Sequence, residues 1–476
     1  MVAQRWQSSP GAPGAPSTPG TRRALTRRWG LAGGMGGMAL LGGALAGCGA
    51  DPGAGPAGSR KEPVKLSLST DWTTGIREQT VKRWTVEFPA TNPNVREVEI
   101  WTAPAEGTTA GAYNIKVQTA IAAGSGPDVM MEVWPTDPPG ILLPLDPYLK
   151  QRRFNKADYW WSKYYQETED GRIFSLPMGA YVGGMVANVD LFERAGVKLP
   201  AKDWTFADLR DIARRLKSDR VWGVERQLGA WDQGWTNWLA SEGAEWYDRK
   251  TLKTTLATGR DGGKPEEMFA DWAGLVWRDR LAPNPDEVNT VRQNAGLSSG
   301  PLFATGLIAL SGFPFYQAGL QKEAIAGRFR FQALWPPRSP YSGRRGYHLE
   351  TNCITVNKLT KAPDEAFALA HYWLTDDMSR FLAANLPVMP PGRKWHRSKE
   401  VTSVAPGMEI FPDVADEAQK IGNDRHKWQG GTGASPKSLE WLRAVRAPLE
   451  AEALTKGTDP RAAFRESVAA GDRALA

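Results

Sequence analysis

Acidic and aromatic side chains stand together where two predicted strands end. Asp71 and Trp72 close the alternating stretch VKLSLSTDW, and Glu132 and Trp134 follow the apolar stretch PDVMM. A carboxylate can accept hydrogen bonds from two hydroxyl groups, and an aromatic ring can cover the apolar face of a pyranose. In open α/β sheets, ligands bind beside the carboxyl ends of the strands. These four residues therefore predict a site for a sugar.

A charged ligand or a cofactor fits the sequence less well. A phosphate or carboxylate ligand calls for clustered arginines, and we interpret the pairs Arg152-Arg153 and Arg344-Arg345 as solvated loop charges. The four histidines lack a metal-binding spacing such as H-E-x-x-H, and GRDGGKP has proline where a phosphate-binding loop needs serine or threonine. We therefore expect no metal and no cofactor.

The first 47 residues have the pattern of an export signal, with arginines, a glycine-rich apolar run and then small residues. Two arginine pairs, Arg22-Arg23 and Arg27-Arg28, each follow a threonine and resemble a twin-arginine signal. The Phe and Lys that usually follow such a pair are missing. General secretory export is therefore the alternative.

A short motif at the end of this segment resembles the lipobox of bacterial lipoproteins. It reads Leu45-Ala46-Gly47-Cys48, and in lipoproteins the cysteine is lipidated and begins the mature chain. We therefore expect residues 1–47 to be removed and Cys48 to carry the lipid. Residues 48–62, rich in Gly, Pro and Ala, are expected to form a flexible tether.

The composition of the mature chain excludes one class of partner. The whole chain has a net charge of +7, but residues 1–47 hold five arginines and no acid, so the rest carries 7 − 5 = +2. This charge gives no reason to expect nucleic acid. Cys353 is the only other cysteine, so no internal disulfide is expected. About 430 mature residues exceed a single core and predict two or three domains.

Alternating strand and helix patterns predict a parallel α/β sheet. The predicted elements are a strand at 64–72, a helix containing Val81, Trp84 and Phe88 that Pro89 soon stops, a strand at 95–101, a helix from Asn114 to Gly124 and a strand from Asp128. Farther on, Thr205 and Asp208 predict a capped helix. Trp231, Trp235 and Trp238 share one helix face, which we interpret as packing, although Trp231 is kept as a candidate ligand contact.

Six motifs then follow one another in order along most of residues 63–475. They are GSGPDVMM (124–131), LLPLDPYL (142–149), GRIFSLPMGAYVGGMVANVDLFERAGV with WTFADL (171–209), WLASEGAEWYD (238–248), FATGLIALSGF (303–313) and NCITVNKLTKAPDEAFALAHYWLT (352–375). In this order they resemble the family 1 extracellular solute-binding proteins of ABC importers, which include the maltose-binding proteins.

The resemblance implies a fold and its division into lobes. The family has a two-lobed α/β fold of the periplasmic-binding-protein type (type II), in which a hinge joins the lobes and a ligand cleft lies between them. Lobe I is expected to comprise residues 63–180 and 348–386, and lobe II residues 181–347 and 387–476. The chain is expected to cross between the lobes around 176–182, 347–352 and 385–392.

The resemblance also adds candidate site residues. Tyr181 follows LPMGA at the expected hinge, Phe313 follows Gly312 where relatives carry an aromatic residue, and Glu350 lies at the second crossing. Trp335, in the loop ALWPPR, is expected to line the rim. The complete candidate site is Asp71, Trp72, Glu132, Trp134, Tyr181, Trp231, Phe313, Trp335 and Glu350.

The function expected from the resemblance is binding without catalysis. The protein is expected to be a monomeric, lipid-anchored receptor on the extracytoplasmic face of the membrane that delivers a sugar or oligosaccharide to the transmembrane subunits of an ABC permease. Other polar solutes, such as glycerol phosphates, remain alternative ligands.

Three other functions are the alternatives to a receptor. The main alternative is a secreted, Trp-rich glycoside hydrolase, with Glu132 and Glu350 as available carboxylates. An interaction lipoprotein without a small ligand is the second. GLSSG also matches the G-x-S-x-G nucleophile motif around Ser298, but the residues before it form a poor strand, so a serine hydrolase is disfavoured.

Overall fold

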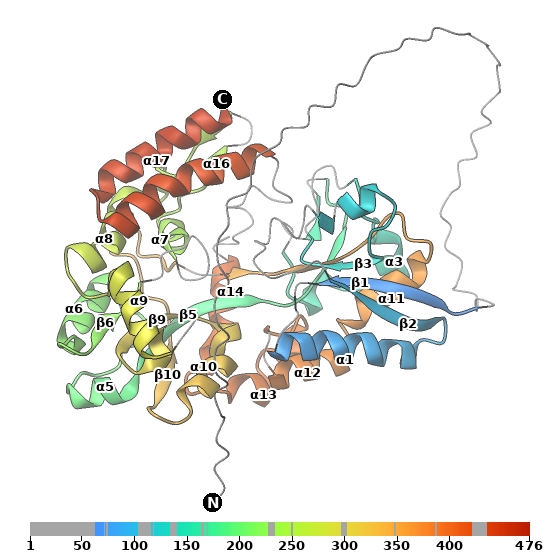
Figure 1. Ribbon diagram of the computed structural model, residues 1–476, viewed down its shortest axis with the longest axis horizontal. Helices are drawn as coiled ribbons and strands as arrows, with labels where there is room; N and C mark the ends of the chain where they lie inside the picture. The colour runs from blue at the N-terminus through green and yellow to red at the C-terminus, as the bar shows by residue number, and fades with distance from the viewer. Residues whose placement is uncertain are drawn as a thin grey trace, which may run out of the picture. The chain divides into compact units, whose positions relative to one another are not determined.

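The computed structural model describes the chain in fourteen segments. They are residues 62–70, 72, 75–102, 116–117, 119–133, 140–162, 166–168, 170–226, 234–248, 251–296, 302–346, 349–385, 388–420 and 436–476. All of them lie within Ala54–Ala476, which forms one compact unit. Two main sheets form within this unit (Figure 1), and a short hairpin pairs β7 (Tyr247–Asp248) with β8 (Lys253–Thr254).

The first sheet, with its helices, forms lobe I and has the strand order β2-β1-β3-β12-β4. β1 (Val64–Thr70) pairs in parallel with β2 (Val95–Thr102) and β3 (Val129–Met131). β12 (Cys353–Val356) runs antiparallel to β3 and to β4 (Ser175–Pro177). The three predicted parallel strands are confirmed. β12 has the opposite direction because the chain enters it from the other sheet, without a crossover helix.

Helices cover the first sheet, and the first of them is the helix that the apolar periodicity predicts. They are α1 (Gly75–Thr91), α3 (Asp146–Gln151), α11 (Pro363–Tyr372) and α12 (Asp376–Asn385). Val81, Trp84 and Phe88 of α1 are buried, and the helix ends two residues after Pro89, as expected. The Trp84 Nε1–H donates to the Leu369 carbonyl of α11 at 3.0 Å, which joins the two helices across the core.

The second sheet, with its helices, forms lobe II and has the order β10-β5-β9-β6. Its strands are β5 (Tyr181–Asn188), β6 (Trp222–Val224), β9 (Ile308–Pro314) and β10 (Phe331–Leu334). β5 is antiparallel to both β9 and β10, whereas β6 is parallel to β9. The short strand β11 (Leu349–Glu350) also pairs with β5, so these two residues lie with lobe II, just past the boundary expected at 347/348.

Helices of lobe II pack against this sheet and against each other. They are α5 (Val189–Arg194), α6 (Phe206–Leu216), α7 (Trp235–Ser241), α8 (Pro265–Trp277), α9 (Pro285–Asn294), α10 (Ala318–Ile325), α13 (Lys399–Thr402), α14 (Phe411–Lys420), α16 (Pro436–Arg446), the π-helical η6 (Ala447–Lys456) and α17 (Pro460–Leu475). The predicted cap of α6 is confirmed, because Thr205 Oγ1 accepts from the Asp208 N–H while the Asp208 carboxylate accepts from the Thr205 N–H.

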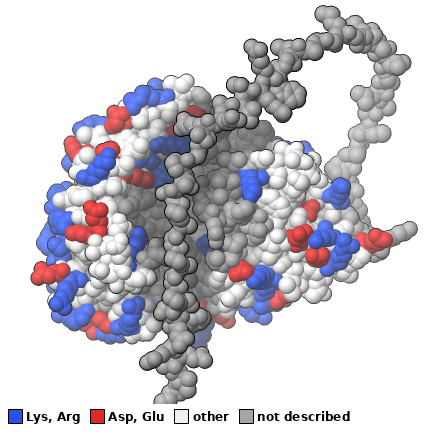
Figure 2. All heavy atoms as spheres, in the orientation of Figure 1, with Lys and Arg blue, Asp and Glu red and all other residues white. Residues whose placement is uncertain are grey.

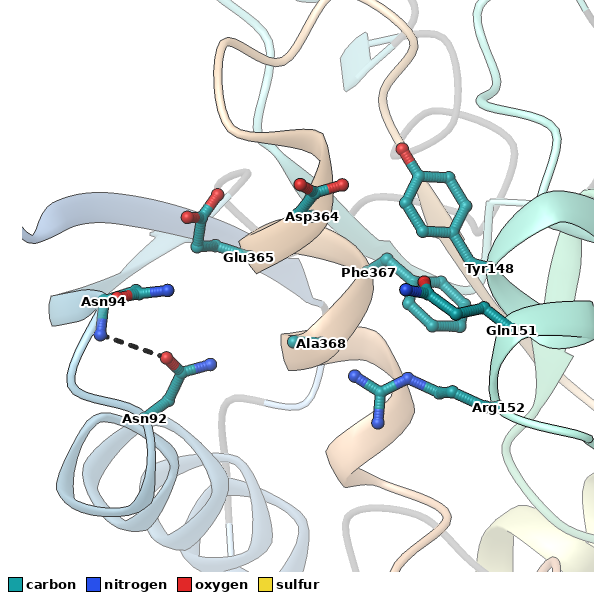
Figure 3. Close-up of a pocket in the computed structure, with 9 residues that line it drawn as sticks. All are labelled: Asn92, Asn94, Tyr148, Gln151, Arg152, Asp364, Glu365, Phe367 and Ala368. Carbon is teal, nitrogen blue, oxygen red and sulfur yellow. Dashed lines mark hydrogen bonds between the residues drawn. The ribbon is translucent and has the colours of Figure 1, made fainter. Parts of the chain in front are cut away.

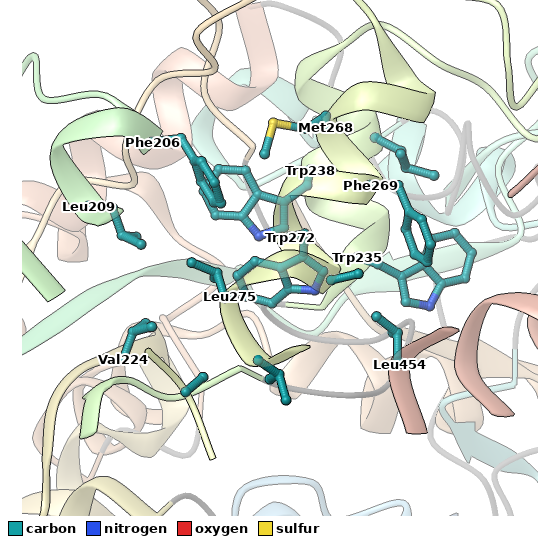
Figure 4. Packing of buried hydrophobic residues seen from close by; sticks show 14 of the residues in the cluster. Phe206, Leu209, Val224, Trp235, Trp238, Met268, Phe269, Trp272, Leu275 and Leu454 are labelled. Atoms are coloured by element: carbon teal, nitrogen blue, oxygen red, sulfur yellow. The ribbon is translucent and has the colours of Figure 1, made fainter. Parts of the chain in front are cut away.

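Tryptophans of α7 and α8 form the centre of the lobe II core (Figure 4). Trp235 and Trp238 are both buried, and the Trp238 ring lies 5.3 Å from Trp272 and 4.9 Å from Phe206. Aromatic pairs at these separations stabilise a core beyond their buried area. The interpretation of Trp235 and Trp238 as packing positions is confirmed.

The two neighbouring segments that connect the lobes differ in length by one residue. β4 ends at Pro177, which is paired with Cys353, and β5 begins at Tyr181, which is paired with Glu350. Residues 178–180, the first crossing, therefore lie opposite residues 351–352, the second crossing. The extra residue makes a bulge, which bends a strand pair locally.

A third segment closes this junction. The Ala180 N–H donates to the Met389 carbonyl at 3.1 Å, and the Met389 N–H donates to the Ala180 carbonyl at 3.3 Å. Gly179 adopts φ +144°, and a Cβ at this position would lie 2.1 Å from the Met389 carbonyl oxygen. The three segments are therefore packed tightly where the chain passes between the lobes.

A buried histidine, His396, and a partly buried one, His371, predict that the fold is sensitive to acid. Burial lowers the pKa of His371 and of His396 to about 4, whereas a histidine in an unfolded chain titrates near ~6.5. Between these values the unfolded state binds protons that the native state does not, so stability is lost as the pH falls from ~6.5 towards 4. From about pH 7 to about pH 5, we expect urea denaturation to show a loss of about 2 kcal/mol per histidine.

Glutamine substitutions separate the contribution of each histidine from that of carboxylates that also take up protons as the pH falls. In His396→Gln, an amide N–H can still donate to the Pro390 carbonyl, as the imidazole Nε2 does at 2.8 Å, but no proton is taken up on unfolding. The loss of unfolding free energy between about pH 7 and about pH 5 should then be smaller by the contribution of one histidine, about 2 kcal/mol. An undiminished difference in both His371→Gln and His396→Gln would contradict the assignment.

The surface carries charges of both signs. Figure 2 shows basic and acidic side chains interspersed on the described face, without a broad patch of one sign. Many of them are paired, as Arg330 is with Asp190 and Arg461 with Glu267. Among the described helices, none has the length and apolar character of a membrane span.

Candidate functional site

Glu132 is the centre of the candidate site in lobe I. It follows the carboxyl end of β3 and adopts φ +59°, a left-handed conformation that is uncommon for a residue other than glycine. Its N–H donates to the Cys353 carbonyl at 2.8 Å. Its Oε1 accepts from Trp72 Nε1 at 3.1 Å and from Asn352 Nδ2 at 2.7 Å. The side chain is partly exposed but fixed in place by these contacts.

The chemistry of these partners determines the direction of both hydrogen bonds. An indole N–H can only donate, and an ionised carboxylate can only accept. The amide of Asn352 must therefore present its nitrogen to Glu132. Trp72 and Glu132, predicted from the ends of two strands, are brought together, because the carboxyl ends of the parallel β1 and β3 lie at one edge of the sheet.

Trp72 is buried, with only 2% of its surface exposed. Its ring makes an edge contact with Trp373 at 5.8 Å, and the guanidinium of Arg77 lies 5.1 Å from its centroid. Trp373 in turn contacts Trp84. In this structure the ring is therefore packed into lobe I, and its contribution to the site is the N–H that holds Glu132.

Two other predicted residues belong to a hydrophobic cluster of lobe II. Phe313 of β9 is fully buried, 6.0 Å from the ring of Phe411 in α14, within a cluster of lobe II. Trp335 is partly buried just after β10. The Lys202 ammonium lies 4.1 Å and the Arg345 guanidinium 5.0 Å from the Trp335 ring. The structure therefore does not gather these two residues with the lobe I group.

The remaining predicted residues are placed only in part. Tyr181 begins β5 at the junction, and its ring is buried in the same cluster as Trp72. The backbone of Glu350 pairs with Tyr181, but its side chain lies outside the described part of the structure. Asp71, Trp134, Trp231 and Cys48 also lie outside the described residues, as does Ser298.

The interpretation of Arg345 as a solvated charge is wrong. Its side chain is fully buried, and it donates to the Lys202 and Pro336 carbonyls and to the carboxylates of Asp203 and Glu417. The neighbouring Arg344 is partly exposed and pairs with Asp261. Adjacent charges in a loop look alike in sequence, and only the long-range partners of Arg345 distinguish it.

Asn352 is the site residue that sequence reasoning missed. It lies in the second crossing, and it reaches Glu132 because β12 pairs beside β3. An asparagine in a motif carries no signal of this role, since its partner is more than two hundred residues away. Cys353, the next residue, is a free buried thiol whose pKa is raised, mainly by burial.

A separate cavity of about 340 Å³ lies in lobe I (Figure 3). It is lined by Asn92, Asn94, Tyr148, Gln151, Arg152, Asp364, Glu365, Phe367 and Ala368. Asn94 immediately precedes β2, and its carbonyl accepts from the N–H of Val64 at the start of β1. The cavity therefore lies towards the amino ends of these strands, whereas Glu132 lies at the carboxyl ends. None of the predicted site residues lines it.

The described residues offer no evident metal centre. Among them, no three His, Cys, Asp or Glu side chains gather as metal ligands would. The polar chemistry of the lobe I group is that of a fixed carboxylate with an amide and an indole N–H beside it. Such a group can accept hydrogen bonds from hydroxyl groups.

Comparison with known proteins identifies similar chains. Residues 75–379 match the family model described as bacterial extracellular solute-binding protein. A candidate binding protein of Brucella abortus (strain 2308) is 28% identical over 285 residues, which are 59% of this chain and 66% of that protein. The match thus spans just under two thirds of that relative.

Solved structures share the fold at low sequence identity. An ABC substrate-binding protein from Listeria monocytogenes in complex with cycloalternan has a TM-score of 0.66 at 17% identity, over 87% of this chain and 99% of that one. Maltose-bound MalE3 of T. maritima also has a TM-score of 0.66, at 19% identity, over 85% and 98%. The predicted two-lobed fold of type II is thereby confirmed.

Proposed function

The chain belongs to the family of bacterial extracellular solute-binding proteins, and from this membership we propose that it is the receptor of an ABC importer for a sugar or oligosaccharide. The ligand binds in the cleft between the lobes, and the lobes close on it by a hinge motion. The closed form then delivers the ligand to the transmembrane subunits of the permease. The receptor itself performs no catalysis.

The observation that carries the proposal is the fixed carboxylate of Glu132. It stands at the carboxyl edge of the lobe I sheet, partly exposed, and is held by Trp72 and Asn352. A preorganised acceptor binds hydroxyl groups without losing side-chain freedom at that moment. The sugars in the two similar structures, cycloalternan and maltose, are consistent with such chemistry.

We further propose that the receptor is a monomer held outside the cytoplasmic membrane by a lipid on Cys48. The support is the sequence Leu45-Ala46-Gly47-Cys48 and the Gly/Pro/Ala-rich segment that follows it. Metabolic labelling with a fatty acid tests this part of the proposal, with Cys48→Ala as the control. Equal labelling of both chains would refute the anchor.

A ligand screen tests the receptor itself. The unit Ala54–Ala476 would be heated with a panel of saccharides that includes maltose and cycloalternan. Because a ligand that binds only the folded state stabilises it by about 2.7 kcal/mol at one hundred times its Kd, one saccharide class should raise the Tm by several degrees. If no saccharide shifts the Tm and reducing ends are released from a polysaccharide, the hydrolase alternative is favoured.

Substituting Glu132 is expected to weaken saccharide binding. Glu132→Ala removes a charged acceptor, and hydrogen bonds to charged groups contribute about 1.5–3 kcal/mol, so we expect Kd to rise about 10- to 100-fold. Isothermal titration with the panel member that binds measures this change. The matched control is Glu97→Ala, an exposed carboxylate of β2 that pairs with Lys65. Equal effects of the two substitutions would place the ligand elsewhere.

A further inference from the structure

We propose that Asn352 is a positioning residue that couples the state of Glu132 to the junction between the lobes. The inference deepens the proposed function, because it assigns the route by which the ligand site biases closure.

Asn352 contacts the candidate site and the junction at the same time. Its side chain, 8% exposed, donates from Nδ2 to Glu132 Oε1 at 2.7 Å. Its backbone carbonyl accepts from the N–H of Met178 in the first crossing at 3.0 Å. A single residue of the second crossing therefore links the end of β3 to the neighbouring crossing strand.

The backbone reinforces this link. The Glu132 N–H donates to the carbonyl of Cys353, the residue after Asn352, at 2.8 Å. Glu132 is thus held by two consecutive residues, once through its backbone and once through its carboxylate. These contacts offset the cost of its left-handed φ of +59°. Releasing either contact allows the end of β3 and the second crossing to relax together.

The bulge makes the junction responsive to this change. The three residues 178–180 lie opposite the two residues 351–352. The two crossings therefore do not form a regular ladder of backbone hydrogen bonds. Oε1 of Glu132 already accepts from Trp72 and Asn352, so a ligand hydroxyl that donates to this same oxygen competes with Asn352 for it. Asn352 then shifts relative to Met178, which alters the balance between lobe orientations. By linkage, the factor by which the ligand shifts the equilibrium towards the closed form is also the factor by which closure raises the affinity of the site.

The test is amide hydrogen exchange at the junction in the unliganded protein. The observed amides are those of Met178 and Ala180, whose acceptors are Asn352 and Met389. We expect Asn352→Ala and Glu132→Ala each to raise exchange at both amides about 10-fold, on the order of 1.4 kcal/mol. The double variant should exchange no faster than the faster single variant, because both substitutions break the same link.

Two further variants separate coupling from general destabilisation. Glu132→Gln keeps an acceptor oxygen for Trp72 and Asn352, so exchange at the junction should stay within about 3-fold of the wild type. Asn357→Ala removes another buried amide near the end of β12, which donates to the Pro127 carbonyl at 3.0 Å. It should raise exchange across lobe I without singling out Met178 and Ala180.

Two results would overturn the proposal. In one, Glu132→Ala leaves exchange at Met178 and Ala180 unchanged while Asn352→Ala raises it. In the other, the effects of the two single substitutions multiply in the double variant, as they do for independent sites. Failure of the receptor function would appear separately, as the absence of saccharide binding by the wild type.

Discussion

Replacing Gly179 by alanine is expected to cost the fold at least about 3 kcal/mol of unfolding free energy. Gly179 adopts φ +144°, and an added Cβ would lie 2.1 Å from the Met389 carbonyl oxygen and 2.9 Å from Val388 Cγ2. The Met389 carbonyl cannot retreat freely, because Met389 exchanges two backbone hydrogen bonds with Ala180. The substitution therefore separates the third segment from the first crossing. Urea denaturation of Ala54–Ala476 measures the loss.

The same substitution should also impair closure of the lobes. Small-angle scattering of the wild type is expected to show compaction when a saccharide of the panel binds, whereas Gly179→Ala should show little or none. The matched control is Gly196→Ala, where φ is +62° and no atom lies within 4 Å of the added Cβ. There only the left-handed conformation opposes alanine, at a cost of about 1 kcal/mol. Equal losses at the two glycines would show that conformation alone, and not the contact with Met389, determines the effect.

The local elements of this fold could be predicted from sequence because their signals are short-range. The alternation in β1, the apolar spacing in α1 and the Thr205 cap each depend on a few neighbouring residues. The meeting of Trp72 and Glu132 could also be anticipated, since both residues end parallel strands. Six ordered motifs supplied the family and hence the two lobes.

The rest depends on pairing between distant segments. The bulge opposite residues 351–352 is a property of register, which no single strand reveals. Asn352 reaches Glu132 only because the returning strand β12 lies beside β3. Phe313 is buried because α14 supplies Phe411 much later in the chain. Its aromatic type alone is equally compatible with a ligand contact and with a core.

Arg345 shows how a distant network can reverse an interpretation of charge. The guanidinium donates to four acceptors, which are the carbonyls of Pro336 and Lys202 and the carboxylates of Asp203 and Glu417, at 2.7 to 2.9 Å. It also lies over the ring of Trp335. A buried charge is tolerated when its hydrogen bonds are satisfied in this way. Arg345 therefore joins the loop after β10 to the segment before α6 and to α14.

Arg345→Met is accordingly expected to destabilise the protein by about 3 kcal/mol, because it removes the hydrogen bonds of a buried, charged donor to the Pro336 and Lys202 carbonyls and to Glu417. Asp203 is exposed and keeps Arg338 as a partner, so its share of the loss is small. Methionine fills much of the same volume, so the loss reports the network more than a cavity. The control is Arg330→Met, whose exposed guanidinium also has two carboxylate partners, Asp190 and Glu193. Exposed pairs are screened by solvent, so this variant should unfold at nearly the wild-type urea concentration. If both variants lose the same stability, the four hydrogen bonds of Arg345 contribute no more than a surface ion pair, and the loop after β10 is held by its apolar contacts instead.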